Sequence, residues 1–370
     1  MNRKKRIVIV GAGASGLAAS IRAASEGAAV TVLEHMEESG KKLLLTGNRK
    51  CNLSNTDVSA EHYYGDGEFV SSILSGFQFE LCQLFFKSLG LETEIVYNAY
   101  DGTGYLYPSS GKAEDVRDAL LRKALSLGVR FEYGCKLTGI DVTDGGFVLE
   151  SASESYAADA LILACGSNAH PETGSDSSIY PLLKELGVGF HSFLPALVPL
   201  YSKAEELEAL KGIRCDGHCR LLIDGFPEKE AYGQIQLNAH SVSGIPVLNL
   251  SSPAVRALSQ GKEVRLQIRF FPTEYNIRQN AVLERRLDGQ LFPQTLELPI
   301  HKSGGFRHAQ SCSGGIPVDE IDPETLESRK VKGLYFAGEL IGVDGECGGY
   351  NLHFAWASGM LAGSCAAQKA

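Results

Sequence analysis

The sequence predicts an α/β fold: a parallel sheet flanked by helices, with a second, β-rich domain inserted into it. The first 34 residues run as strand, glycine turn, helix and strand, the pattern of a βαβ unit. From about Phe190 the chain carries short strand-like runs separated by Gly, Pro and polar residues. Residues 333–339 then restore the opening pattern of a buried strand followed by glycine. We therefore expect a first domain in two parts, residues 1–190 and 309–370, around an insertion of residues 191–308.

The opening turn, residues 11–16, has the spacing of a phosphate-binding motif. It reads Gly-Ala-Gly-Ala-Ser-Gly and follows a run of four apolar residues. Gly11 permits the tight turn, Gly13 lets the backbone approach a pyrophosphate, and Gly16 allows a helix to pack closely on the strand. Ala14 and Ser15 begin that helix, whose N-terminus offers oriented N–H groups to an anion.

Glu34 ends the second strand, about twenty residues after the glycines, the spacing at which an acid binds a ribose. An ordinary βαβ unit with a glycine-rich turn would leave this acid unexplained. A carboxylate also disfavours a 2′-phosphate, so the motif predicts FAD or NAD rather than NADP.

Periodicity and turn residues predict the remaining elements. Residues 39–55 read as a loop over the ligand. We expect amphipathic helices over 68–89 and 113–127, with strands over 129–133, 147–150, 160–166 and 333–339 in the first domain and over 197–201, 219–223, 247–250 and 264–270 in the insertion. The buried face of the helix over 68–89 is predicted to comprise Phe69, Ile73, Leu74, Phe77, Leu81, Leu84 and Phe85.

Charge and composition exclude several classes of protein. The 44 acidic and 35 basic residues give a net charge of −9, which disfavours a nucleic-acid partner. Nothing resembles a signal peptide or an apolar run long enough to span a membrane, so we expect a cytoplasmic protein.

The nine cysteines are scattered and odd in number, which predicts reduced thiols rather than disulfides. The one tight cluster, residues 215–219, reads Cys-Asp-Gly-His-Cys but has no second Cys/His pair nearby at metal spacing. We interpret it as small residues in a turn and predict no metal.

A second dinucleotide motif is absent from the sequence, because Gly102-Thr103-Gly104 lacks both a third glycine and a preceding apolar strand. The choice is therefore between FAD alone and NAD alone. Two further strand ends face the same ligand in this interpretation, at Ala164 and Gly166 and at Gly338 and Glu339.

Two longer segments narrow the choice. Residues 41–55, Lys-Lys-Leu-Leu-Leu-Thr-Gly-Asn-Arg-Lys-Cys-Asn-Leu-Ser-Asn, and residues 348–359, which begin Gly-Gly-Tyr-Asn-Leu, resemble the two signatures of a bacterial family of FAD-dependent oxidoreductases. This family, of the glutathione-reductase-like NAD(P)/FAD-dependent type, includes aminoacetone oxidase and 3-dehydro-bile acid Δ4,6-reductase. The resemblance spans nearly the whole chain.

The resemblance implies a Rossmann-like FAD domain with a β-rich insertion, and FAD as cofactor. It implies that Glu339 meets the ribityl and pyrophosphate region of FAD. Beyond the opening motif and Glu34, it implies that FAD is bound by Lys42, Leu43, Thr46, Gly47, Asn48, Asn52, Ala164, Gly166, Gly338, Glu339, Gly348, Gly349, Tyr350 and Asn351.

The chain departs from the family pattern at several positions. Arg49-Lys50 stands where the family has Gly-Arg, Ala239 stands at the family histidine with His240 beside it, and His353 replaces a glutamine. The insertion also looks short after Phe271. These departures bear on the identity of the substrate.

The candidates for acid–base chemistry are His353, His240, Tyr350 and Cys51. Each has an alternative as a packed or surface residue, and amine oxidation by a flavin needs no protein base. The glycine pair 348–349 is expected to aim backbone N–H groups at the flavin N1–O2 edge.

We therefore expect an FAD-dependent oxidoreductase that transfers hydride between flavin N5 and a small organic substrate. The reaction would be amine oxidation or reduction of an activated C=C bond such as that of a steroid enone, with NAD(P)H as a possible transient donor. Two alternatives stay open: an NAD-dependent dehydrogenase without flavin, and a flavin-bound RNA-modifying or scaffold protein. The oligomeric state is not predicted.

Overall fold

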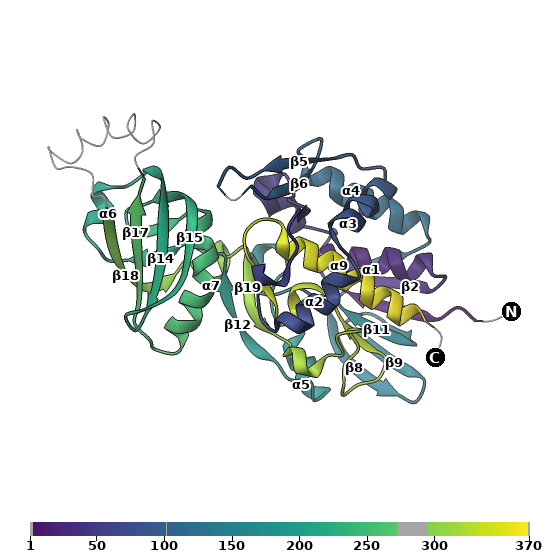
Figure 1. Ribbon diagram of the computed structural model, residues 1–370. Coiled ribbons are helices and arrows are strands. Elements are labelled where there is room, and N and C mark those ends of the chain that lie inside the picture. Colours follow the sequence, from purple (N-terminus) through teal and green to yellow (C-terminus); the bar gives the residue numbers. More distant parts are fainter. Residues whose placement is uncertain (1–2, 101, 272–294, 369–370) are drawn as a thin grey trace. The chain divides into compact units, whose positions relative to one another are not determined.

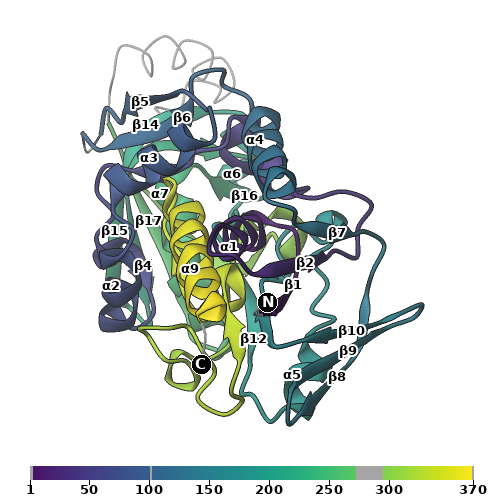
Figure 2. The same cartoon turned by 90° about the vertical axis from the view of Figure 1, so that its right-hand side faces the viewer.

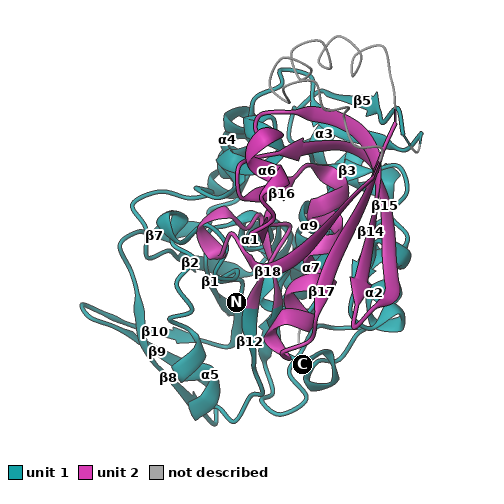
Figure 3. Ribbon diagram, turned by 90° about the vertical axis from the view of Figure 1, so that its left-hand side faces the viewer, with its two compact units in different colours: residues 1–193, 314–370 teal, residues 194–313 magenta. Residues whose placement is uncertain are grey.

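The computed structural model describes residues 3–100, 102–271 and 295–368, and the chain divides into two compact units. Unit 1 comprises residues 1–193 and 314–370, and unit 2 is the insertion, residues 194–313 (Figure 3). The boundaries between the units, after residues 193 and 313, lie a few residues beyond the expected ones, after residues 190 and 308. The segment after Phe271, which looked short in the sequence, lies outside the described residues.

The core of unit 1 is a five-stranded sheet in the order β20-β11-β1-β2-β7, and every neighbouring pair in it is parallel. Its strands are β1 (Arg6–Val10), β2 (Ala29–Leu33), β7 (Arg130–Glu132), β11 (Ala160–Leu163) and β20 (Leu334–Phe336). The apolar runs of the central strands follow from burial on both faces. The predicted α/β architecture is confirmed.

Six α-helices of unit 1 are described (Figure 1). They are α1 (Ala14–Ser25), α2 (Gly67–Ser75), α3 (Phe79–Ser88), α4 (Ala113–Ser126), α5 (Tyr180–Glu185) and α9 (Tyr350–Ala367). Short 3₁₀ segments are η1 (Leu43–Arg49), η2 (Ala60–His62), η3 (Pro171–Thr173), η5 (Val318–Glu320) and η6 (Gly338–Leu340).

Helices α1 and α9 lie side by side (Figure 2). They pack closely because glycine stands at two positions of α9 one turn apart. A Cβ at Gly363 would lie 2.5 Å from the carbonyl oxygen of Ala19, and one at Gly359 would overlap with that of Ser15. The first and last helices of the chain are thereby locked together.

Smaller sheets surround this core. They are the hairpin-linked sheet of β8 (Leu137–Thr143), β9 (Gly146–Ser151) and β10 (Ser155–Ala158); the sheet of β3 (Ser54–Asn55), β5 (Thr93–Tyr97) and β6 (Gly104–Pro108); the pair β4 (Tyr63–Tyr64) and β21 (Asp344–Gly345); and the pair β12 (His191–Ala196) and β19 (Ser311–Gly315).

The single helix predicted over 68–89 is wrong, because α2 and α3 are separated by Gly76, Phe77 and Gln78. The break turns the second helix relative to the first, so the predicted apolar face is only partly confirmed: Phe69, Ile73, Leu74, Phe77 and Phe85 are buried. Leu81 and Leu84 are 46% and 59% exposed, whereas Phe86, which was not predicted, is fully buried. A constant 3.6-residue period predicts the buried face of one continuous helix, and it gives the wrong face after a break in the helix.

Unit 2 is a closed antiparallel barrel in the order β13-β16-β15-β14-β17-β18, which confirms the β-rich insertion. Its strands are β13 (Leu200–Ser202), β14 (Arg214–Ile223), β15 (Phe226–Leu237), β16 (Ser241–Ser243), β17 (Val264–Phe270) and β18 (Thr295–Ser303). It also contains α6 (Glu206–Ala209), α7 (Ile245–Ser259) and η4 (Phe306–His308).

Two local predictions in unit 2 are wrong. Residues 247–250, expected as a strand, lie in α7, which begins after Gly244 and carries Pro246 in its first turn, where proline favours a helix. Cys215 and Cys219, expected in a turn, lie on β14, where alternation buries both.

Among the described residues, no single helix is long and apolar enough to cross a membrane. Helices α2 and α3, bent by 45° at their break, meet the length and composition criteria only as a pair.

Candidate functional site

The strand ends of the unit 1 sheet gather the predicted cofactor residues along one edge. Gly11 N–H bonds to Leu33 O at 2.8 Å, and Ala164 N–H bonds to Val10 O at 2.9 Å. Ala337 N–H continues the ladder to Leu163 O at 3.0 Å. The ends of β20, β11, β1 and β2 therefore lie next to one another, where parallel sheets bind their ligands.

The glycine turn at this edge has the predicted geometry. Gly11 has φ +102°, and a Cβ there would lie 2.5 Å from Ala164 O. A Cβ at Gly16 would overlap with Gly11 O, so only glycine fits either position. At Gly13, by contrast, a Cβ would meet nothing within 4 Å. Gly13 thus opens onto free space, which suits the close approach of a ligand.

The N-terminus of α1 is available to an anion. No side chain of the described residues caps it, and its first turn contains no acidic residue. Ala14 and Ser15 form that first turn. A helix N-terminus left in this state attracts phosphate through its N–H groups and its dipole.

Glu34 is buried and bonded to the backbone around it. Its Oε2 accepts a hydrogen bond from Ala12 N–H at 2.8 Å, and its Oε1 accepts one from Met36 N–H at 2.9 Å. The acid thus shapes the glycine turn. Its predicted ribose contact stays a prediction.

Lys42 and Glu339 form an ion pair that joins the loop after β2 to the end of β20. Gly166, with φ +73°, lies against this pair, since a Cβ there would be 4.0 Å from Lys42 Nζ. Gly338 N–H donates to Ser358 Oγ at 2.9 Å, which ties the same strand end to α9. Four segments of the chain therefore meet here: the loop after β2, the ends of β11 and β20, and α9.

The loop around η1 holds a run of left-handed residues. Gly47, Asn48, Arg49 and Cys51 have φ values of +54°, +56°, +67° and +59°. Leu43, at the start of η1, is buried, and its carbonyl accepts from Thr46 Oγ1 at 2.7 Å. Several adjacent non-glycine residues in this region store strain, which is typical of functional segments.

Asn52 presents an unsatisfied acceptor beside the N-terminus of α9. It is 8% exposed, and within the described chain its Oδ1 has no hydrogen-bond partner. A Cβ at Gly349 would lie 2.9 Å from that oxygen and 2.6 Å from Ser54 O. A buried acceptor of this kind is costly unless a donor fills the space beside it, so it fits the N–H of a bound ligand.

The turn before α9 combines Gly348 and Gly349, with φ +135° and +97°. Gly348 O accepts from Asn55 Nδ2 at 3.1 Å. Asn351 bonds to both backbone groups of Gly345, at 2.9 Å from its N–H and 2.8 Å from its carbonyl, and so holds the chain leading into the turn. Asn351 thus has a structural role in addition to the predicted cofactor contact.

His353 packs in the core of unit 1. It is fully buried, its Nδ1 lies 2.7 Å from Ser54 Oγ, and its Nε2 lies 2.7 Å from Phe77 O. Nε2 must donate to the carbonyl, and Nδ1 then accepts from the hydroxyl. Burial lowers its pKa to about 4, so the ring is neutral near pH 7 and has both nitrogens occupied. This environment gives it a packing role in place of acid–base chemistry.

The other three acid–base candidates are placed differently. Cys51 is fully buried, which raises its pKa to about 12 and keeps the thiol protonated. Tyr350 is buried in the first turn of α9. His240 is exposed in the turn between β15 and β16 of unit 2.

A cluster that sequence reasoning missed flanks the α9 turn: Asp57, His62 and Glu346. His62 Nε2 lies 3.0 Å from Asp57 Oδ2, its Nδ1 lies 3.2 Å from Glu346 Oε2, and its ring stacks on Tyr350 at 4.4 Å. Glu346 follows these residues by nearly three hundred positions, so no local motif could reveal the contact.

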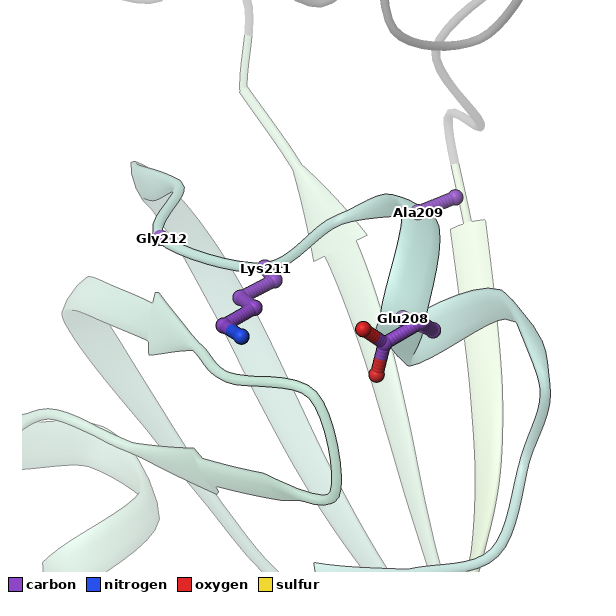
Figure 4. A pocket seen from close by; sticks show the side chains of 4 residues that line it. All are labelled: Glu208, Ala209, Lys211 and Gly212. Atoms are coloured by element: carbon purple, nitrogen blue, oxygen red, sulfur yellow. The ribbon is translucent and has the colours of Figure 1, made fainter.

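Unit 2 has an open depression beside α6, lined by Glu208, Ala209, Lys211 and Gly212 (Figure 4). It presents one acid and one base at the surface and no set of groups suited to redox chemistry. No group of three or more His, Cys, Asp or Glu that could hold a metal occurs among the described residues.

The comparisons with known proteins agree with this architecture. Residues 5–365 match the family model described as the HI0933-like protein Rossmann domain. The chain belongs to this family. It is 35% identical to a 3-dehydro-bile acid delta(4,6)-reductase of Clostridium scindens, over 98% of this chain and 99% of that protein.

The chain is also similar to a ribosomal RNA dihydrouridine synthase of Haemophilus influenzae, with 27% identity over 97% of each chain. The fold is similar to that of a 3-ketosteroid-delta4-(5alpha)-dehydrogenase from Rhodococcus jostii RHA1, with TM-score 0.60, 16% identity and coverage of 100% of this chain and 98% of that one. A flavocytochrome c3 fumarate reductase gives TM-score 0.55 at 15% identity, over 99% of this chain and 78% of that one.

These findings confirm the resemblance, the Rossmann-type flavoprotein fold with its β-barrel insertion, and the assignment of the chain to the oxidoreductases.

Proposed function

We propose that this protein is a cytoplasmic FAD-dependent reductase of C=C bonds conjugated to a carbonyl group. The observation that carries the proposal is a set of features in unit 1: an open glycine turn before the uncapped α1, the uncapped N-terminus of α9, and the unsatisfied Asn52 Oδ1 beside that second N-terminus. A dinucleotide with a hydrogen-bonding ring satisfies all of these features at once.

The residues present fit FAD. The N-terminus of α1 with Gly13 would hold the pyrophosphate, and Lys42 with Glu339 lies at the next strand ends for the ribityl region. Asn52 and the Gly348-Gly349 turn would bind the polar edge of the flavin. When bound, FAD supplies hydride exchange at its N5 atom.

The chain's own groups do the positioning. The N-terminal dipole of α9 favours negative charge at its end, and its backbone N–H groups are fixed by the glycine turn before chemistry begins. The strained loop from Gly47 to Cys51 is closed by backbone bonds, from Cys51 N–H to Thr46 O at 3.0 Å and from Lys50 N–H to Gly47 O at 3.1 Å. Such preorganisation lowers the barrier because nothing must reorient during the reaction.

Two relatives support the type of bond reduced. The 35% identical protein is named for reduction at a delta(4,6) position of a 3-dehydro-bile acid, where double bonds are conjugated to the 3-carbonyl. A dihydrouridine synthase forms a base that differs from uracil by two hydrogens across C5–C6, a bond conjugated to the C4 carbonyl. An enone or an enone-like base is therefore the substrate class that both have in common.

The proposal favours a small enone over RNA because the net charge is −9. An RNA substrate remains the second candidate on the strength of the dihydrouridine synthase relatives, which align over 95% or more of the chain.

The test is an anaerobic stopped-flow series. The flavin of the purified protein is reduced with NADH or NADPH and then mixed with a 4-en-3-one steroid, a ribosomal RNA fragment or buffer. A separate sample, in which the flavin is still oxidised, is mixed with aminoacetone. We expect NAD(P)H to bleach the flavin and the steroid enone to restore its absorption. Restoration by RNA alone would favour the second candidate. Reduction of the oxidised flavin by aminoacetone, with no response to any enone, would contradict a reductase.

A further inference from the structure

His62 contacts both sides of the turn that precedes α9. On one side its Nδ1 lies 3.2 Å from Glu346 Oε2, and its carbonyl accepts from Glu346 N–H at 2.9 Å. On the other side its ring stacks on Tyr350 with centroids 4.4 Å apart and planes at 19°. Gly348 and Gly349 lie between these two contacts. One side chain therefore braces the turn from both ends.

The geometry defines the charge on His62. An ionised carboxylate only accepts hydrogen bonds, and a neutral imidazole has only one N–H. Because Asp57 faces one nitrogen and Glu346 faces the other, two ionised carboxylates are both hydrogen-bonded only when the ring is an imidazolium. The hydrogen bond to Glu346, together with that to Asp57, raises the pKa of His62 above 6.5 against the effect of burial.

The other titratable groups on these segments do not change the charge inferred for His62. Glu61 in η2 and Glu68 at the start of α2 are exposed. Tyr63 on β4 donates its hydroxyl to Tyr350 O at 3.0 Å, and burial raises the pKa of its phenol. Cys347, in the turn itself, has its pKa raised to about 12 by burial and is neutral. The hydrogen bonds to Glu346 and Asp57 thus keep the pKa of His62 above its ordinary value, which favours the imidazolium.

We propose that His62 is a positioning residue for the cofactor: protonated, it holds the Gly348-Gly349 turn in the form that binds FAD, and deprotonated, it releases that turn. The inference rests on the proposed function, since it assigns FAD to this turn. When His62 loses its contacts with the turn, a smaller fraction of molecules is ready to bind FAD. The apparent dissociation constant for FAD then rises by the same factor by which this fraction falls.

The test measures the FAD dissociation constant of the apoprotein by flavin fluorescence at constant ionic strength, from about pH 6 to about pH 9, a range in which histidine titrates. The wild-type constant should rise by about fivefold or more with pH, a coupling at the low end of the usual range. His62→Gln has no titratable charge and carries both of its donors on one nitrogen, so it cannot bond to acids on two sides as the ring does. This variant should bind FAD weakly and without this pH dependence.

His218→Gln is a matched control in unit 2. His218 lies 2.9 Å from Glu230 and stacks on Tyr232 at 4.4 Å and 23°, so it has the same kinds of partner as His62. This variant should follow the wild-type curve. A His62→Gln curve that coincides with wild type would overturn the inference.

Glu346→Gln gives a second, independent arm. It keeps an acceptor beside Nδ1 but removes the charge, so the midpoint of the pH dependence should move to lower pH. An unchanged midpoint would contradict the inference. Failure of every form to bind FAD at any pH would instead refute the proposed function, so the two failures are distinguishable.

Discussion

Arg49 occupies a backbone conformation that suits glycine. Its φ is +67°, so the chain carries a large cation where the left-handed backbone favours glycine. A non-glycine residue in the left-handed region costs about 1–2 kcal/mol. The position is exposed, so no buried contact of the arginine offsets this strain.

Arg49→Gly should therefore raise the free energy of unfolding by about 1 kcal/mol, since relief of strain exceeds the entropic cost of glycine. Lys50→Gly is the matched control, because Lys50 is an adjacent exposed cation with φ −96°. That variant should lose roughly 0.5–1 kcal/mol. Urea denaturation of both variants measures the difference. Changes of the same sign would show that the left-handed backbone at Arg49 is not strained.

The lowered pKa of His353 predicts that the free energy of unfolding decreases at acidic pH. Its pKa is about 4 when folded and near 6.5 when unfolded, so the unfolded chain binds the extra proton between these values. Stability from this residue is fully present above pH 6.5 and falls as the pH drops toward 4, by at most about 1.4 kcal/mol per pH unit.

His353→Gln should reduce this dependence while keeping the fold. Glutamine can donate to Phe77 O and accept from Ser54 Oγ, as the neutral ring does. Denaturation midpoints at several pH values between about 4 and about 7 give the slope. An unaltered slope would mean that His353 is protonated in the folded state and has been misplaced in the core.

At the scale of single residues, sequence motifs predict a residue's role correctly when that role depends on its neighbours in the sequence. The roles of Gly11 and Gly16 follow from a six-residue turn, and the structure shows that no Cβ fits at either position. Sequence motifs fail to predict a role that depends on tertiary contacts. The burial of His353 and the clamp on His62 depend on residues hundreds of positions away, which spacing in the sequence cannot reveal.

At the scale of elements, the contact between α1 and α9 sets the relative position of two helix N-termini that we assign to the cofactor. Gly363→Ala should force the helices apart, because the new Cβ would lie 2.5 Å from Ala19 O. We expect a loss of roughly 1–3 kcal/mol from overpacking. FAD affinity should fall in parallel.

Ser364→Ala, at the next position of α9, is the control. Within the described part of the chain, its hydroxyl bonds to two exposed residues, Arg22 and Glu26. Thermal unfolding and FAD titration of both variants test the prediction. Equal behaviour of the two variants would show that the glycine contact does not determine the helix spacing.

Helices and strands were predictable from the sequence where the pattern of buried and exposed residues is regular along their whole length. β17 was predicted as residues 264–270 and is found there, because its burial alternates regularly. The break between α2 and α3 was not predicted. It leaves Phe77 O free to accept from His353, and that tertiary bond is invisible to local periodicity.

At the scale of the whole molecule, the chain leaves and re-enters unit 1 through neighbouring strands, β12 and β19. The insertion therefore interrupts the sequence of unit 1 without interrupting its sheet. The composition could predict two units, but their closed-barrel and parallel-sheet topologies come from long-range pairing.

Calorimetry should assign FAD to unit 1. At one hundred times its dissociation constant, FAD adds about 2.7 kcal/mol to the unit that binds it. This corresponds to a rise of roughly 5–10 °C for a domain of this size. Leu163→Ala in unit 1 and Leu266→Ala in unit 2, both fully buried, identify the transition of each unit. An FAD-dependent shift confined to the transition that Leu266→Ala lowers would place the cofactor elsewhere.

The flavin content of the purified protein tests the central claim most directly. We compare wild type with Gly349→Ala, whose Cβ would meet Ser54 O at 2.6 Å, and with Gly128→Ala, which has a similar positive φ but open space around it. We predict one FAD per chain in wild type and Gly128→Ala, and little in Gly349→Ala. A colourless wild type that binds NAD, or full flavin content in Gly349→Ala, would contradict the account.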